Sequence, residues 1–151
     1  MRKPVIASLV SLGRVGRLAL VGLLFCATRL VEARSSADIQ SGTATYFTAR
    51  SCQLEGNSGL WTASGERYIE SGMTCALPHR QFGGIYKVTN TGNGRSILVR
   101  HNDLGPGRGP RKRGVIVDLT PAAFDQLGGK RGINRRGVAW GEIAVRVERV
   151  R

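Results

Sequence analysis

Asp103 is the carboxylate in this sequence whose surroundings best suit proton transfer. It follows the β-branched run Ser96–His101 and stands before Leu104-Gly105-Pro106, where glycine and proline end a strand. A carboxylate at a strand end is held by a rigid element beside a loop. It can protonate the leaving oxygen of a glycosidic bond if an apolar setting raises its pKa, and the neighbouring Leu104 favours that setting. The alternative is that Asp103 only forms the turn.

Other residue types around Asp103 suit sugar binding, and each also has a purely structural interpretation. His101 and Asn102 precede Asp103 on the same strand; His101 either packs or binds sugar. Asp118 at the end of Val115–Leu119 is predicted to be structural, holding a loop by hydrogen bonds. The indole of Trp61, and the rings of Tyr46 and Trp140, stack on sugars or fill a core. In the basic loop 107–114, Arg108 and Arg111 are predicted to contact an anionic strand, the alternative being a solvated loop.

Short strands are the main elements that must position these side chains. Residues 42–47, 84–89, 96–101, 115–119 and 138–150 are rich in strand-forming residues or alternate in hydrophobicity. Asn93-Gly94 predicts a hairpin between the second and third of these runs. Thr120-Pro121 predicts the start of a short helix that Gly128 ends, and residues 73–77 predict a helical turn before Pro78. The pattern, roughly five or six short strands and one short helix, favours a mainly β fold, a small barrel.

The first 33 residues have the features of an export signal. Basic residues precede an apolar segment, Leu18–Ala27, that is too short to span a bilayer. Cleavage is predicted after Ala33, or after Ala37 at a second site; an uncleaved anchor is the alternative. Bulky Phe25 before Cys26 argues against a lipoprotein. The predicted organisation is a signal peptide at 1–33, a flexible lead-in at 34–41 and one barrel domain at 42–151.

Charge and cysteine content narrow the class of partner. The chain of 151 residues has a formal net charge of +13, which favours an anionic partner. Export makes a wall polymer a better candidate than nucleic acid.

Removal of the signal leaves Cys52 and Cys75, and an oxidising compartment predicts one disulfide between them, worth about 3 kcal/mol; two free thiols are the alternative. Their spacing, with no histidine at ligand distance, does not make a metal site.

Six motifs in order resemble the rare-lipoprotein-A-like family of double-psi β-barrels, which includes septal-ring lytic transglycosylases and is distantly related to expansins and some endoglucanases. The motifs cover nearly all of the chain after residue 41. They are Gly42–Phe47, Thr62–Glu66, Phe82-Gly83, Val88–Asn90 with Asn93–Ser96, Asn102–Pro106 and Val117–Thr120.

The resemblance implies a single six-stranded double-psi β-barrel with one or two short helices. It also implies a periplasmic or secreted monomer that acts on peptidoglycan without a cofactor or stable membrane insertion. It implies cleavage between MurNAc and GlcNAc to 1,6-anhydroMurNAc ends, with Asp103 as the acid and Glu66 as the second carboxylate. A transglycosylase needs only one acid/base, because the 6-hydroxyl of the substrate attacks the anomeric carbon. The alternative function is a non-catalytic, expansin-like glycan-binding module. This sequence differs from the family at Leu77, where a histidine is usual and His79 lies two places on, and at Leu104, where an arginine is usual.

Overall fold

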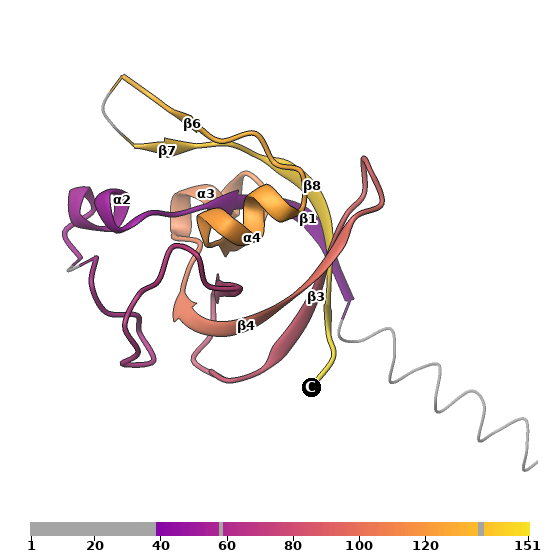
Figure 1. Cartoon of the computed structure of the whole chain (residues 1–151), viewed down its shortest axis with the longest axis horizontal. Helices are drawn as coiled ribbons and strands as arrows, with labels where there is room; N and C mark the ends of the chain where they lie inside the picture. The colour runs from indigo at the N-terminus through magenta and orange to yellow at the C-terminus, as the bar shows by residue number, and fades with distance from the viewer. Residues whose placement is uncertain (1–38, 58, 136–137) are drawn as a thin grey trace, which may run out of the picture. The chain divides into compact units, whose positions relative to one another are not determined.

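The computed structural model describes residues 39–57, 59–135 and 138–151. Six strands close into a barrel in the order β1-β5-β2-β4-β3-β8 (Figure 1). Their bounds are Ile39–Tyr46 (β1), Thr74–Leu77 (β2), Ile85–Asn90 (β3), Ser96–Leu104 (β4), Val115–Leu119 (β5) and Ile143–Arg149 (β8). The predicted mainly β fold with a six-stranded barrel is therefore confirmed.

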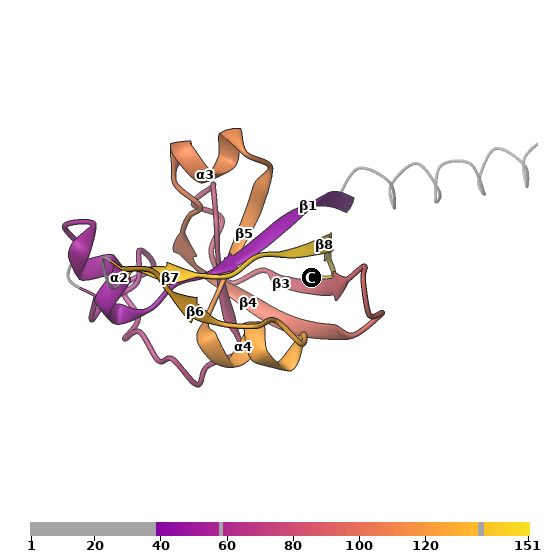
Figure 2. The same cartoon turned by 90° about the horizontal axis from the view of Figure 1, so that it is seen from above.

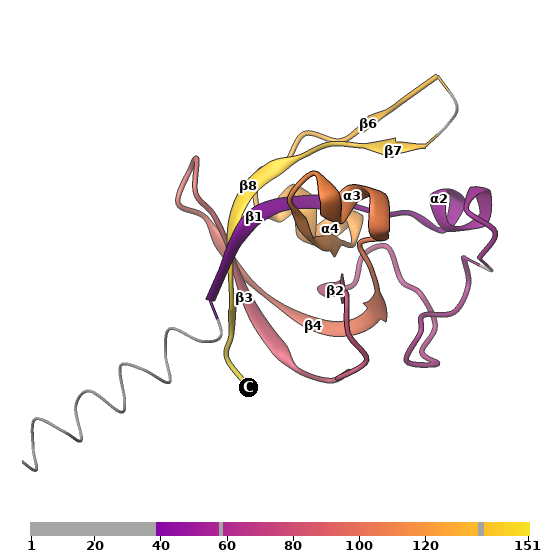
Figure 3. The same cartoon turned by 180° about the vertical axis from the view of Figure 1, so that it is seen from behind.

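Three short helices and a small hairpin complete the described part of the chain. The helices are α2 (Ala49–Leu54), α3 (Arg108–Lys112) and α4 (Pro121–Gln126), and the hairpin pairs β6 (Gly132–Ile133) with β7 (Ala139–Trp140). Figure 2 shows α3 and α4 on opposite sides of the barrel. The hairpin and α2 project beyond the barrel in the same direction (Figures 1 and 3).

Alternating side chains build the barrel core. In β5, Val115, Val117 and Leu119 are buried while the residues between them are partly exposed. Helix α4 covers the core with Phe124, whose ring lies 5.1 Å from that of Tyr46 between centroids. The predicted hairpin joins β3 to β4, and Gly94 in its turn has the positive φ of 74° that favours glycine.

Strand β2 determines where the functional residues meet. It lies between β4, to which it is parallel, and β5, to which it is antiparallel. Ala76 on β2 is in register with Asp103 on one side and with Asp118 on the other. Two carboxylates that are distant in sequence thus flank the same small residue at one edge of the barrel.

Several predicted elements differ from the structure. Residues 74–77 form strand β2 rather than a helical turn, because they pair with strands on both sides. Strand β1 begins at Ile39, inside the predicted lead-in, by pairing with β8. Two predicted loops contain helices α2 and α3; α2 begins at a capping box between Thr48 and Ser51. The single strand predicted at 138–150 is divided into β7 and β8.

The predicted signal peptide, its cleavage sites and Cys26 lie outside the described residues. Within the described residues, the helices are too short and too polar to cross a membrane.

The predicted disulfide is absent from the structure, where Cys52 and Cys75 are free thiols. Cys75 is fully buried in the barrel core, whereas Cys52 is partly exposed on α2. Burial raises the pKa of Cys52 to about 11, with a smaller contribution from the negative charge of Asp103. Burial also raises the pKa of Cys75. Both thiols are therefore protonated and weakly nucleophilic near neutral pH.

Candidate active site

A pocket of about 410 Å³ opens where β2, β4 and β5 meet the loop that follows α2. Asp103 and Asp118 line it, together with Trp61 and the half-buried Cys52. The pocket thus combines three carboxylates, those of Glu55, Asp103 and Asp118, with an exposed indole, a combination that suits a polar ligand with an apolar face.

Asp103 is fixed in the pocket by backbone hydrogen bonds. Its Oδ1 accepts the N–H of Ala63 at 2.9 Å and the N–H of Leu104 at 2.8 Å. Among the described residues, none donates a hydrogen bond to Oδ2. One oxygen therefore orients the carboxylate while the other is available to a ligand. Leu104 is 38% exposed and contributes its N–H rather than an apolar cover.

The loop Thr62–Glu66 holds the Asn102-Asp103 segment in place. The N–H of Ser64 donates to the carbonyl of Asn102 at 3.1 Å, beside the bond from Ala63 to Asp103. The loop is closed on itself by the N–H of Thr62, which donates to the carbonyl of Glu66 at 2.8 Å. Gly65 in this motif has a positive φ of 86°, which favours glycine, although a Cβ added there would meet nothing within 4 Å.

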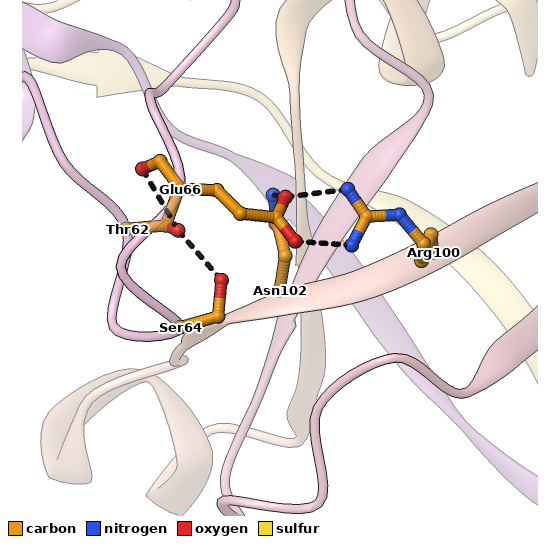
Figure 4. Close-up of polar contacts among 5 residues, drawn as sticks. All are labelled: Thr62, Ser64, Glu66, Arg100 and Asn102. Atoms are coloured by element: carbon orange, nitrogen blue, oxygen red, sulfur yellow. Dashed lines mark hydrogen bonds and ion pairs between the residues drawn. The ribbon is translucent and has the colours of Figure 1, made fainter.

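Glu66 forms a paired contact with Arg100 (Figure 4). Both of its oxygens accept from the guanidinium of Arg100, and Oε2 also accepts from the amide of Asn102 at 3.0 Å. These bonds, led by the one from Arg100, lower the pKa of Glu66 to about 2. Glu66 is therefore ionised at neutral pH and does not line the pocket. That Glu66 takes part in catalysis stays a prediction, and these contacts tie its carboxylate to the strand that carries Asp103.

His101 and Asn102 are buried and do not line the pocket, and their contact with substrate stays a prediction. The imidazole nitrogens of His101 lie 3.1 Å from the carbonyl of Gln81 and 2.9 Å from that of Asp103. Its ring packs against His79 and Phe82, with centroid distances of 4.7 and 5.1 Å. His101 thus anchors the backbone at Asp103.

Asp118 is half-buried and has the electrostatics that the sequence suggested for Asp103. Desolvation, partly offset by a hydrogen bond from Thr45 Oγ1 to Oδ1, raises the pKa of Asp118 to about 6. Gly105 lies beside it: a Cβ at that position would come within 2.8 Å of Oδ2 of Asp118. Its bond with Thr45 agrees with the predicted structural role, but Asp118 also lines the pocket.

The remaining predicted binding residues divide between the pocket and the solvent. Trp61 lines the first pocket and is 60% exposed. Arg108 lines a second, adjoining pocket of about 400 Å³, whereas Arg111 lines neither.

Arg100, the partner of Glu66, was not predicted from the sequence; its position two residues before Asn102 on the same strand was the available signal. No three His, Cys, Asp or Glu side chains in the described ranges are grouped so as to hold a metal ion.

The fold and the site together define a class of protein: a closed six-stranded β-barrel that carries carboxylates near the ends of its strands. The chain belongs to the double-psi β-barrel family described as "Lytic transglycolase", whose model matches residues 39–145. The predicted family is therefore confirmed.

Curated relatives agree with this family. The chain is similar to "Probable endolytic peptidoglycan transglycosylase RlpA" of Nostoc sp., with 46% identity over 74 residues, which are 49% of this chain and 19% of that protein. It is also similar to the "Endolytic peptidoglycan transglycosylase RlpA" of Neisseria meningitidis, with 37% identity over 59% of this chain and 33% of the relative. A relative in Synechocystis sp. is 41% identical over 60% of this chain and 25% of its own length. The chain thus matches between 19% and 33% of the length of these relatives.

Proposed function

We propose that this chain is an endolytic lytic transglycosylase domain that cleaves peptidoglycan strands between N-acetylmuramic acid and N-acetylglucosamine. Membership of the family and the names of the relatives support the proposal. The observation that carries it is the carboxylate of Asp103, which lines a pocket with Oδ1 oriented by two backbone N–H groups.

In the proposed first step, protonated Asp103 donates its proton to the glycosidic oxygen. The C1–O bond of the muramic acid residue breaks, the bonding electrons leave with that oxygen, and positive charge develops at C1. In the second step, the 6-hydroxyl of the same sugar attacks C1 and Asp103 takes the hydroxyl proton. The product has a 1,6-anhydro ring, no water is consumed, and Asp103 is returned to its protonated form.

Glu66 acts in this mechanism by positioning rather than by proton transfer. Its carboxylate joins Arg100 to Asn102, the residue directly before Asp103. A carboxylate with a pKa of about 2 remains charged throughout the reaction. Asp118 is a further ionisable group in the same pocket, and its charge contributes to the raised pKa of Cys52.

The proposed setting is the cell envelope, where peptidoglycan is found. We infer export through the predicted signal peptide to the periplasm or the exterior, and action as a monomer on glycan strands. The basic composition suits an anionic wall polymer.

The test is to incubate the purified chain with peptide-free glycan strands and to analyse the products by mass spectrometry. Fragments with 1,6-anhydro ends are expected. Fragments with ordinary reducing ends would instead indicate hydrolysis and contradict the mechanism.

Exposed Trp61 beside the pocket favours a second candidate, a glycan-binding module without cleavage. It predicts that the chain sediments with cell-wall sacculi while it releases no fragment from any glycan strand.

A further inference from the structure

A third pocket, of about 390 Å³, lies between the start of α2 and the β6–β7 hairpin. It shares no lining residue with the pocket at Asp103. A ligand in the third pocket would therefore leave the proposed active site accessible.

The two faces of the hairpin line different pockets. Gly132 is in register with Trp140, and Ile133 with Ala139. Because successive residues of a strand point to opposite faces, the side chains of Ile133 and Trp140 lie on opposite faces of the hairpin. Ile133 accordingly lines the third pocket and not the second, whereas Trp140 lines the second and not the third. Ile133 is 75% exposed, so its apolar side chain is accessible to a ligand.

The side chains around the third pocket are held in place by contacts among themselves. The buried ring of Tyr46 lines the pocket, and its hydroxyl donates a hydrogen bond to the carbonyl of Gly132. The guanidinium of Arg131 lies over the same ring, with Cζ 6.0 Å from the centroid, and its Nε donates to Oδ1 of Asp125 at 2.7 Å. A site that is ordered before binding loses less conformational entropy when a ligand arrives.

The third pocket also differs from the other two in charge. Arg50 and Arg131 line it, and no described aspartate or glutamate does, whereas Glu55 and Asp118 line both other pockets. Arg50 forms no ion pair with a described residue. Asp125 contacts Nε of Arg131, so the two terminal nitrogens of that guanidinium remain for a ligand. Two guanidinium groups beside an apolar wall suit a carboxylate that is joined to an aliphatic group.

We propose that the third pocket binds the C-terminal end of a peptide whose last residue is aliphatic. Arg50 and Arg131 bind the terminal carboxylate, and the last side chain packs on Ile133 and Ala139. The volume is near the lower limit of ligand pockets, which suits one chain end rather than a long segment. An inorganic anion would leave the apolar wall uncovered, whereas a peptide end satisfies both parts of the site. This inference does not depend on the proposed cleavage of glycan.

The test is an NMR titration of the purified chain with three acetylated tetrapeptides. One ends in leucine with a free carboxylate, one ends in the same leucine with an amidated C-terminus, and one ends in serine with a free carboxylate. Inorganic phosphate and vesicles of phosphatidylglycerol are titrated separately. The free-carboxylate leucine peptide should shift the backbone N–H signals of Thr48, Ile133 and Ala139, and the titration gives its Kd.

Amidation of the leucine peptide should weaken binding about 10- to 100-fold, because the guanidinium groups lose a charged partner. Arg50→Ala with Arg131→Ala should cause a loss of the same size for the free-carboxylate peptide and none for the amidated one. Ile133→Ser should remove most of the preference for leucine over serine. Arg111→Ala is the matched control, because this exposed arginine lines none of the three pockets, and it should change little.

Unfolding curves check that each variant folds. The ion pair lost in Arg131→Ala is exposed, so stability should change little. Arg50→Ala alone leaves that ion pair intact and should still cause part of the loss of affinity.

Equal affinity for the free and amidated peptides would overturn the inference, and so would equal losses in Arg111→Ala and the double variant. Shifts that map to the Asp103 pocket, tighter binding of phosphate than of the peptide, or binding to the vesicles alone would also overturn it. The double variant should form anhydro ends at the wild-type rate, since neither arginine lines the Asp103 pocket, and a lower rate would contradict a separate site. Peptide binding as expected in a wild-type chain that cleaves no glycan would support this site and reject the proposed cleavage.

Discussion

Asp118→Asn should make the stability of the barrel less dependent on pH. In the folded chain desolvation raises the pKa of Asp118 from 3.8 to about 6, so the native state holds this proton more tightly than the unfolded state. The stability that the group contributes is complete below pH 3.8 and is lost as the pH rises through about 6. A shift of about two pKa units corresponds to a loss of about 3 kcal/mol above that range.

The asparagine introduced by this substitution cannot ionise but keeps an oxygen that can accept the hydrogen bond from Thr45. The assay is urea unfolding of wild type and Asp118→Asn from pH 4 to pH 8. The free energy of unfolding of wild type should fall relative to the variant by most of about 3 kcal/mol across this range. Protonation of Glu66, whose pKa is lowered, affects the free energy of unfolding of both proteins below pH 4.5. Its effect therefore largely cancels in the difference between wild type and variant. A difference that does not change with pH would refute the reasoning.

Two further predictions concern Glu66 and the thiols. Glu66→Gln should lower the cleavage rate about 10- to 100-fold through misplacement of Asp103, while the pH–rate profile between pH 5 and 8 keeps its shape, because the native carboxylate is ionised throughout; a lost or shifted acidic limb would make Glu66 a proton-transfer group. Cys52, with a pKa of about 11, should be alkylated at pH 8 roughly 100-fold more slowly than an ordinary thiol. Peptide mapping after unfolding without reductant should find Cys52 and Cys75 both alkylated; if neither is, the disulfide predicted from the sequence exists after all.

The strands that flank the site were predictable because their patterns are local. Alternation in 115–119 and the β-branched run before Asp103 identify two barrel strands without any tertiary information. The strand-end position of Asp103 also follows from the Gly105-Pro106 break. Strand β2 was not predictable in this way: its four residues are buried or partly buried throughout, so they have no alternation, and neighbours on both sides make them a strand.

The electrostatics of the site depend on contacts between distant residues and were predicted less well. Glu66 is ionised by Arg100, 34 residues away, and Asp118 is bonded to Thr45, 73 residues away. The closure of the barrel brings these pairs together, and a reading of neighbouring residues cannot find them. Proximity to Leu104 suggested an apolar cover for Asp103, but Leu104 is 38% exposed in the closed barrel, and it is Asp118 whose pKa is raised by desolvation. Burial of His101 likewise follows from packing across strands.

The central claim is that Asp103 transfers the proton in cleavage of the glycan. The most direct measurement is the rate of 1,6-anhydro end formation from peptide-free strands by wild type and by Asp103→Asn, with unfolding curves recorded for both. The variant keeps an oxygen that can accept the N–H groups of Ala63 and Leu104, so it should fold as wild type does. Its rate should fall about 10²- to 10⁴-fold, because the amide has no transferable proton. A folded Asp103→Asn protein that forms anhydro ends at the wild-type rate would contradict the account.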